Sequence, residues 1–336
     1  MKVTVLTAIY NGEKYLRQCL DSLKAQTLTE CQFLCIDDGS TDHSADIVLE
    51  YYKSDSRFFL FQTLENRGQA AARNIGLSLA TGEYITMLDA DDWLAPDALE
   101  KAYQTITETP QCDCAVFNVV LHEETNGQQS PYPLKNCQPV MDGQEAFRLS
   151  LDWSLHGYYL IRRSIHLRYP YDTSCRLYSD DNTTRIHFLH SRRVALTEGT
   201  YYYRQHAESL THRYTPMRFL FMDAYSSMKA QILEEIKVGN IQQPAQILTF
   251  FENQRWINYL SMVRYYLEYR HRMSKDEKRG IEHRLKEKLK TFETDKIERR
   301  FKRRFGYMPI KCWPLFRLQA VVFHYTYPIY AKLRRR

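Results

Sequence analysis

Two periodicities alternate in the hydrophobic and polar pattern of the first 121 residues. Short apolar runs rich in β-forming residues predict strands at residues 2–9, 33–36, 58–62, 84–88 and 113–121. Between these runs, apolar residues recur at helical spacing, first at Leu16, Cys19, Leu20 and Leu23. Strands that alternate with helices over short connections are typical of a mostly parallel, Rossmann-like sheet flanked by helices. The pattern therefore predicts an α/β fold for this part of the chain.

Beyond residue 121 the pattern changes twice. Residues 123–145 contain turn-forming residues, and strand and helix signals mix until about residue 215. From Pro216 the pattern is mostly helical, and residues around Phe292, Ile297 and Phe301 predict an amphipathic, solvent-exposed helix. We therefore predict an α/β domain over 1–215, divided into 1–121 and 122–215, followed by a helical extension over 216–336.

Charge separates the end of the chain from the rest. The chain carries a net charge of +6, but residues 270–336 contain 21 Lys or Arg against 7 Asp or Glu, which leaves residues 1–269 at −8. Aromatic residues lie between the basic clusters at 299–304 and 334–336, a combination that suits an anionic membrane surface. A helical subdomain with solvated charges is the alternative. Nucleic acid is not expected as a partner, because no nucleic-acid-binding module is recognisable.

The start of the chain and its cysteines bear on location. The first residues enter a strand without the basic and long apolar regions of a signal peptide. The longest uncharged run near the end, 318–331, has 14 residues, fewer than the roughly 20 that span a bilayer. Eight scattered cysteines without a C-x-x-C pair favour reduced thiols over a metal site. These features predict a cytoplasmic protein that associates at most peripherally with the inner face of the plasma membrane.

Polar residues of types that bind ligands or take part in catalysis follow the predicted strands. In open α/β sheets ligands bind beyond the carboxyl ends of the strands, so the loops at Tyr10, Asp38 and Asp89 are expected to converge. Tyr10, with Ala8 leaving room beside it, suits stacking on a planar base, although a packed tyrosine is the simpler interpretation. Asp38 offers a carboxylate to a base edge or ribose beside the permissive Gly39, and an ordinary turn is its alternative.

Two further positions suit the phosphates of a ligand. Asp89-Ala90-Asp91 presents hard oxygen ligands to Mg²⁺ or Mn²⁺, which would neutralise charge on a diphosphate leaving group. The alternative is a solvated acidic turn before the helix that starts near Pro96. Arg73 lies in a small-residue helix start and suits phosphate, whereas a surface charge is the ordinary role of a single arginine.

Four segments in order resemble glycosyltransferase family 2, whose members have the GT-A fold. They cover about a third of the chain and read TAIYNGEKYL at 7–16, IDDGSTD at 36–42, ENRGQAAARNIGL at 65–77 and GEYITMLDADDWLAPDAL at 82–99. The resemblance implies that Thr7, Ala8, Tyr10 and Asp38 hold the nucleotide base and that Asp89 holds the ribose. It further implies that Asp91 binds the metal and that Arg73 lies near the nucleotide.

The resemblance continues less sharply in the second half. Tyr178-Ser179-Asp180-Asp181-Asn182 matches an acidic pair that acts on the acceptor, although Asp180 stands where the family usually has Glu. Asp181 is thus the candidate catalytic base and Asp180 the second candidate, with an anion-favouring helix start as the alternative. Residues 201–209 resemble a closing segment in which Arg204 reaches the diphosphate and His206 the metal; a structural histidine is equally compatible.

Together with the acidic motif, the resemblance implies an inverting glycosyltransferase that uses Mn²⁺ or Mg²⁺. It would move a sugar from a nucleoside-diphosphate sugar, with UDP preferred, to a hydroxyl of a glycan or lipid-linked acceptor in cell-surface polysaccharide synthesis. A sugar nucleotidyltransferase is a rival, but the chain lacks a glycine-rich loop with Lys near its start. The alternative that is not an enzyme is a catalytically silent scaffold that binds sugar or membrane.

Overall fold

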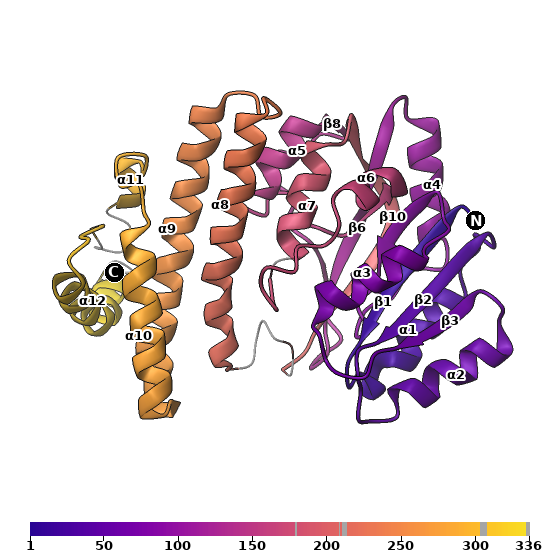
Figure 1. Cartoon of the computed structure of the whole chain (residues 1–336), viewed down its shortest axis with the longest axis horizontal. Helices are drawn as coiled ribbons and strands as arrows, with labels where there is room; N and C mark the ends of the chain where they lie inside the picture. Colours follow the sequence, from indigo (N-terminus) through magenta and orange to yellow (C-terminus); the bar gives the residue numbers. More distant parts are fainter. Residues whose placement is uncertain (179, 208, 210–213, 303–307, 334–336) are drawn as a thin grey trace. The chain divides into compact units, whose positions relative to one another are not determined.

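The computed structural model describes residues 1–178, 180–207, 209, 214–302 and 308–333. They belong to two compact units, Met1–Arg213 and Tyr214–Arg336, which are called unit 1 and unit 2 below (Figure 1). Ser179, Arg303, Arg304 and Arg334–Arg336, which entered the sequence analysis, lie outside the described residues.

Unit 1 is built on one mixed sheet with the strand order β3-β2-β1-β4-β9-β6-β10-β5. Its first half is parallel and contains β1 (Val3–Ile9), β2 (Cys31–Asp37), β3 (Phe58–Gln62) and β4 (Tyr84–Met87). The helices between these strands are α1 (Glu13–Lys24), α2 (Ser44–Ser54) and α3 (Gln69–Leu79). The predicted α/β fold with strand and helix alternating is confirmed.

Alternation along β1 and β2 explains why helices cover both faces of this half. Val3 and Val5 belong to the core cluster that includes residues of α1 and α2. Leu6 points to the opposite face, where it packs with residues of α3. Successive side chains of a strand point to opposite faces, so an almost wholly buried strand needs an apolar layer on each side.

The second half of unit 1 adds antiparallel pairs. Its strands are β5 (Trp93–Leu94), β6 (Cys112–Glu123), β7 (Gln129–Pro131), β8 (Val140–Asp142), β9 (Tyr159–Arg162) and β10 (Arg193–Gln205). Its helices are α4 (Ala98–Glu108), α5 (Gly143–Ser150), α6 (Arg163–Arg168) and α7 (Asp180–Leu189). Strand β10 runs parallel to β6 and antiparallel to β5, where Tyr201 pairs with Leu94. This pairing brings the end of β10 beside the turn at 89–92.

Unit 2 is helical, with α8 (Phe221–Lys237), α9 (Pro244–Tyr269) and α10 (Lys275–Lys290) as its long early helices (Figure 1). The turns η1 (Pro216–Leu220) and η2 (Arg270–Arg272), α11 (Arg299–Lys302) and α12 (Trp313–Leu333) complete it. Trp256 of α9 is fully buried and packs against Phe292 and Phe316.

One prediction for unit 2 is wrong. The residues around Phe292 and Ile297 do not form a solvent-exposed helix, because residues 292–298 are non-helical. Both side chains are buried in the core of unit 2. The dense charges nearby suggested exposure, whereas Phe292 packs against Trp256 and Ile297 belongs to the same hydrophobic core.

Two observations concern the apolar and thiol groups of the chain. Within the described residues, no helix combines the length and the apolar character required to cross a bilayer. All eight cysteines lie in described positions and are free thiols, six of them buried. The prediction of unpaired thiols in the core agrees with this arrangement.

Candidate active site

The loops that follow β1 and β2 are joined directly. The backbone N–H of Asn11 donates to Ser40 Oγ at 2.9 Å, and the N–H of Thr41 donates to Asn11 Oδ1 at 2.8 Å. Asn11 has φ +51°, a left-handed conformation that asparagine tolerates better than most residues. Tyr10, just before it, is 51% exposed, so its ring is free to meet a planar ligand.

Asp38 is buried and holds the loop that leads into α3. Its carboxylate accepts hydrogen bonds from the backbone N–H groups of Arg67 at 3.0 Å and Gly68 at 2.7 Å, and from Thr63 Oγ1 at 3.0 Å. Gly68 has φ +95°, which a residue with a side chain rarely adopts. Asp38 therefore fixes the start of α3, whatever it contributes to a bound base.

The side chains of α3 in turn reach the end of β4. Gln69 Nε2 donates to Asp89 Oδ1 at 2.8 Å, and Arg73 Nη2 approaches the same oxygen at 2.5 Å. Asp38, α3 and Asp89 thus form one connected structure. Burial raises the pKa of Asp89 to about 6, against the lowering effect of the Arg73 cation.

Arg73 also joins the two halves of unit 1. Its guanidinium is 1% exposed, and Nη1 donates to Asp180 Oδ2 at 2.8 Å, 107 residues along the chain. Its charged group lies 5.4 Å from the centre of the Tyr171 ring. The sequence suggested a phosphate ligand at Arg73, whereas the structure places it between two carboxylates, where it connects the β4 turn with the start of α7.

Asp91 lies on the more open side of the β4 turn, with a side chain that is 40% exposed. His206 Nε2 is 3.0 Å from Asp91 Oδ2, and its Nδ1 is buried without a partner among the described residues. Arg204 donates from Nε to the backbone oxygen of Asp91 at 2.8 Å. The predicted metal-binding residues Asp91 and His206 are therefore adjacent, and Arg204 supports the turn that carries Asp91.

Rings and a buried acid hold Arg204 in place. Its guanidinium lies 4.6 Å from the Tyr15 ring centre and 4.7 Å from that of Trp93. The backbone N–H of Arg204 donates to Asp92 Oδ1 at 2.8 Å, and the Tyr201 hydroxyl donates to Asp92 Oδ2 at 2.8 Å. Asp92 is buried, and burial together with the neighbouring carboxylates raises its pKa well above the usual range.

Asp92 and Tyr201 had no assigned role in the sequence analysis. Asp92 stands next to the predicted metal ligand, and Tyr201 is one of three consecutive tyrosines, so the local sequence distinguishes neither. Of those tyrosines, Tyr201 alone is fully buried. No signal in the sequence could have found them, because the burial of Asp92 and the donors that it requires come from elsewhere in the fold.

Asp181 differs from its neighbour Asp180. Asp180 is ion-paired with Arg73, while burial and the charge of Asp180 raise the pKa of Asp181 to about 7. A carboxyl group with a pKa near neutrality is suited to accept and release a proton at neutral pH. The two acids of α7 thus have different electrostatic settings.

The residues around Asp91 fit a divalent cation held partly by substrate. The described residues contain no group of three or more His, Cys, Asp or Glu side chains placed to hold a metal. Mg²⁺ is commonly bound through one or two carboxylates together with substrate phosphates, so a complete protein cage is not required. Asp91, with His206 beside it, would supply such a partial ligand set.

Comparisons with known proteins address the family of the chain. The family model described as Glycosyl transferase family 2 matches residues 4–175. The putative glycosyltransferase EpsH of Bacillus subtilis is 30% identical over 241 residues, which cover 69% of each protein. A poly(ribitol-phosphate) beta-glucosyltransferase of Bacillus spizizenii is 27% identical over 70% of this chain and 38% of its own length.

A solved structure shares the fold. S. aureus TarS 1–349, in a crystal structure with UDP-GlcNAc, superimposes with a TM-score of 0.71 over 97% of this chain and 90% of that chain, at 20% identity. The expected GT-A fold with a helical C-terminal region is thereby confirmed. The matched family model covers the turns at Asp38 and Asp89 as well as Arg73. The protein is a glycosyltransferase with the GT-A fold and belongs to glycosyltransferase family 2.

Proposed function

We propose that this enzyme transfers a sugar, with inversion, from a UDP-sugar to a hydroxyl group of a glycan or lipid-linked acceptor in cell-surface polysaccharide synthesis. The observation that carries the proposal is the Arg73 bridge, which holds Asp89 and Asp180 on one guanidinium. In this proposal Asp89 belongs to the donor side and Asp180 to the acceptor side, so that the bridge would connect the two sides. UDP as the nucleotide is supported by the UDP-GlcNAc complex of TarS.

The donor side of the site is the group of loops after β1, β2 and β4. In this proposal the exposed Tyr10 stacks on the base, Thr7, Ala8 and Asp38 help to hold the base, and Asp89 holds the ribose. Thr7 Oγ1 is buried without a partner among the described residues. Arg73 acts here as a positioning residue, because its guanidinium is occupied by carboxylates.

The diphosphate is expected near Asp91. Asp91 and His206 would hold Mn²⁺ or Mg²⁺ against it, and the ion would neutralise charge on the departing diphosphate. Arg204 keeps the Asp91 turn in place through its backbone contact and adds positive charge nearby. The aromatic rings of Tyr15 and Trp93 also contact this guanidinium.

Asp181 is the proposed base. It would take the proton from the acceptor hydroxyl as that oxygen forms its bond to the anomeric carbon and the bond to the diphosphate breaks. Asp180 is less suited to this role, because its Oδ2 is already engaged by Arg73 Nη1 at 2.8 Å. One base and one direct displacement produce inversion at the anomeric carbon.

A screen of nucleotide sugars for Mn²⁺-dependent hydrolysis tests the donor, with UDP-GlcNAc first and released nucleotide as the measurement. In the Asp91→Ala variant we expect the divalent-dependent activity to be lost. The matched control is Asp46→Ala, which removes a 74% exposed carboxylate on α2 and should behave as wild type. Unchanged metal-dependent hydrolysis by Asp91→Ala would refute the metal assignment.

Preference for a non-UDP donor in the same screen would refute the assignment of the nucleotide while leaving the family intact. Binding of UDP-sugar without any turnover, with or without candidate glycan acceptors, would favour the silent scaffold. Formation of a nucleotide sugar from a sugar phosphate would instead favour the nucleotidyltransferase.

A further inference from the structure

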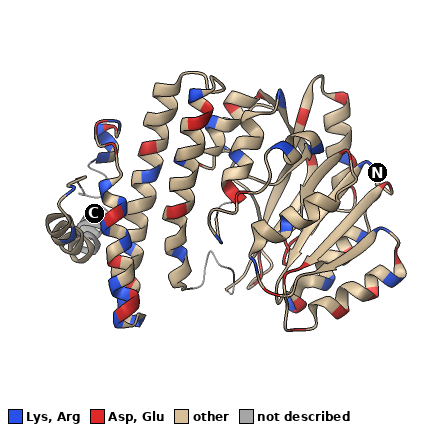
Figure 2. Cartoon of the chain, viewed as in Figure 1, with Lys and Arg blue, Asp and Glu red and all other residues tan. Residues whose placement is uncertain are grey.

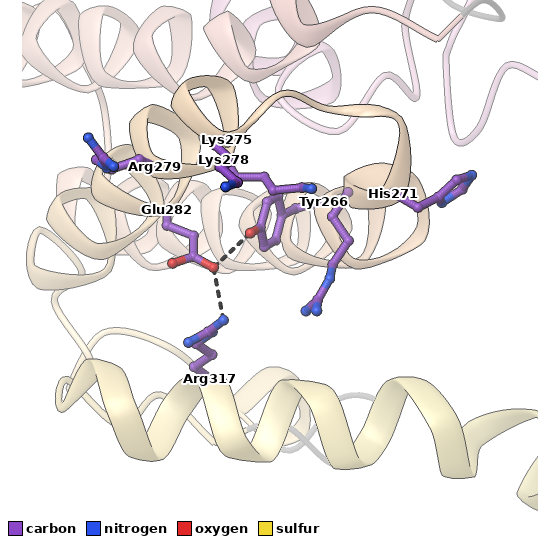
Figure 3. A pocket seen from close by; sticks show the side chains of 8 residues that line it. Tyr266, His271, Lys275, Lys278, Arg279, Glu282 and Arg317 are labelled. Atoms are coloured by element: carbon purple, nitrogen blue, oxygen red, sulfur yellow. Dashed lines mark hydrogen bonds and ion pairs between the residues drawn. The ribbon is translucent and has the colours of Figure 1, made fainter.

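Unit 2 contains an open pocket of about 530 Å³ between the end of α9, the start of α10 and one flank of α12 (Figure 3). Its lining is Tyr266, Arg270, His271, Lys275, Lys278, Arg279, Glu282 and Arg317. All of these residues belong to unit 2.

Positive charge in this pocket is only partly neutralised. Five lysine or arginine side chains face a single lining carboxylate, Glu282, which accepts a hydrogen bond from the Tyr266 hydroxyl at 2.7 Å and pairs with Arg317 at 3.1 Å (Figure 3). Arg279 lies 3.9 Å from Asp276. Arg270, Lys275 and Lys278 have no acidic partner among the residues that the structure describes. Such a cluster favours a ligand that carries phosphate groups.

Helix α12, whose Arg317 lines the pocket, also has an exposed apolar face. Leu315, Leu318, Val322 and Tyr325 of α12 are between 53% and 69% exposed. Their spacing of three and four residues places them on one side of the helix. Phe316 and Ala320, which are buried, occupy the opposite side and pack into the core of unit 2. Acidic and basic residues are dense along α10, whereas the described part of α12 carries few (Figure 2).

We propose that unit 2 docks on an anionic lipid surface, with the pocket holding a lipid phosphate headgroup and the exposed face of α12 lying in the interface. A soluble phosphate polymer would pair with the cations of the pocket but would leave the apolar face of α12 exposed to water. A lipid surface satisfies both features, because it offers phosphate and hydrocarbon at adjacent depths. The basic pocket supplies attraction, and the apolar residues supply burial.

Vesicle binding by the full-length protein tests this proposal. We expect binding to vesicles of phosphatidylcholine mixed with phosphatidylglycerol and little binding to phosphatidylcholine alone. The Lys275→Ala/Lys278→Ala variant should bind roughly twenty- to thirtyfold more weakly, since each cation near an anionic surface contributes about fivefold. Both lysines lie in the first turn of α10, where removal of positive charge does not weaken the helix.

The control is Lys286→Ala/Lys290→Ala, which removes the same charge from exposed positions of the same helix outside the pocket. This variant should lose clearly less affinity than the pocket variant. Equal losses would mean that net charge and not the pocket is responsible, which would overturn the site. Absence of any preference of the wild type for anionic vesicles would overturn the proposal as a whole.

A third variant and a soluble probe separate lipid from other phosphates. Leu318→Ser/Val322→Ser should weaken vesicle binding by about tenfold or more. The reason is that burial of these exposed apolar side chains in the lipid interface contributes to the free energy of binding. Inorganic polyphosphate should bind the wild type and this variant alike. If vesicle binding is unaffected by the α12 variant and polyphosphate competes fully, the ligand is a soluble phosphate and the lipid proposal fails.

The outcome of the vesicle-binding test does not depend on which nucleotide sugar the enzyme uses as donor. Hydrolysis of nucleotide sugar without vesicles is expected to be the same in all three double variants as in wild type, because none of these positions lies in unit 1. Loss of vesicle binding with intact hydrolysis, or the reverse, therefore separates failure of this inference from failure of the proposed function.

Discussion

Buried charge is arranged differently in the two units. In unit 1 two carboxylates, Asp89 and Asp180, share the single buried cation of Arg73, and the pKa of Asp181 is raised to about 7. In unit 2 the fully buried Glu252 has two cations at one carboxylate oxygen, with Arg255 Nη1 at 2.5 Å and Lys229 Nζ at 2.6 Å from its Oε1. One arrangement leaves negative charge in excess, and the other neutralises it.

The contrast indicates what each group of charges is for. Acids without a balancing cation lower the stability of the folded state. Such acids are typical of sites that transfer a proton or bind a cation. A buried carboxylate that two cations neutralise is typical of an internal structural network, whose loss affects folding more than chemistry. The comparison predicts that substitutions in the two units will separate into effects on rate and effects on stability.

The largest expected effect is on the transfer rate of Asp181→Asn. Loss of a positioned base should lower transfer by roughly 10² to 10⁴, because the acceptor hydroxyl keeps its proton. Donor binding, measured by titration with UDP-sugar, should stay close to wild type. As the matched control in unit 2, Glu252→Gln should leave the rate of the folded enzyme unchanged. Retained transfer in Asp181→Asn would reassign the base.

Next in size is the effect of Glu252→Ala on stability. Removal of this carboxylate leaves Lys229 and Arg255 with less compensation in the interior, which typically costs about 3–5 kcal/mol in the free energy of unfolding. Denaturant unfolding followed by circular dichroism measures it. Glu287→Ala, at a half-exposed position of α10, should change the unfolding free energy by less than about 1 kcal/mol. Equal losses in the two variants would remove the contrast between the units.

The smallest effect concerns pH. Because the base must be ionised, transfer should fall as the pH drops below about 7, the pKa of Asp181. Asp180→Asn removes a like charge next to Asp181 and lowers the pKa of the base, so the acidic limb should move to lower pH, by up to about one unit. The pH dependence of transfer at saturating donor shows the shift. A limb that stays in place would mean that Asp181 is not the titrating group.

Local sequence determined the order of elements and the positions of the polar turns. The strand at 58–62 and the helix marked by Leu16 and Leu23 lie where the pattern predicted them. Apolar alternation and helical spacing are properties of neighbouring residues, and so are the turn residues that end each element. The four family segments are local too, which is why the GT-A fold was predictable without a structure.

Only the tertiary structure decided which groups meet. Arg73 contacts Asp180 across 107 residues and Arg204 contacts Asp91 across 113, and no local pattern contains either pairing. Phe292 and Ile297 were misjudged for the same reason, since charged neighbours in sequence do not reveal an apolar space offered by another helix. Side-chain partners, and the pKa values that depend on them, are set by the packing of elements distant in sequence, which becomes defined only when the chain has folded.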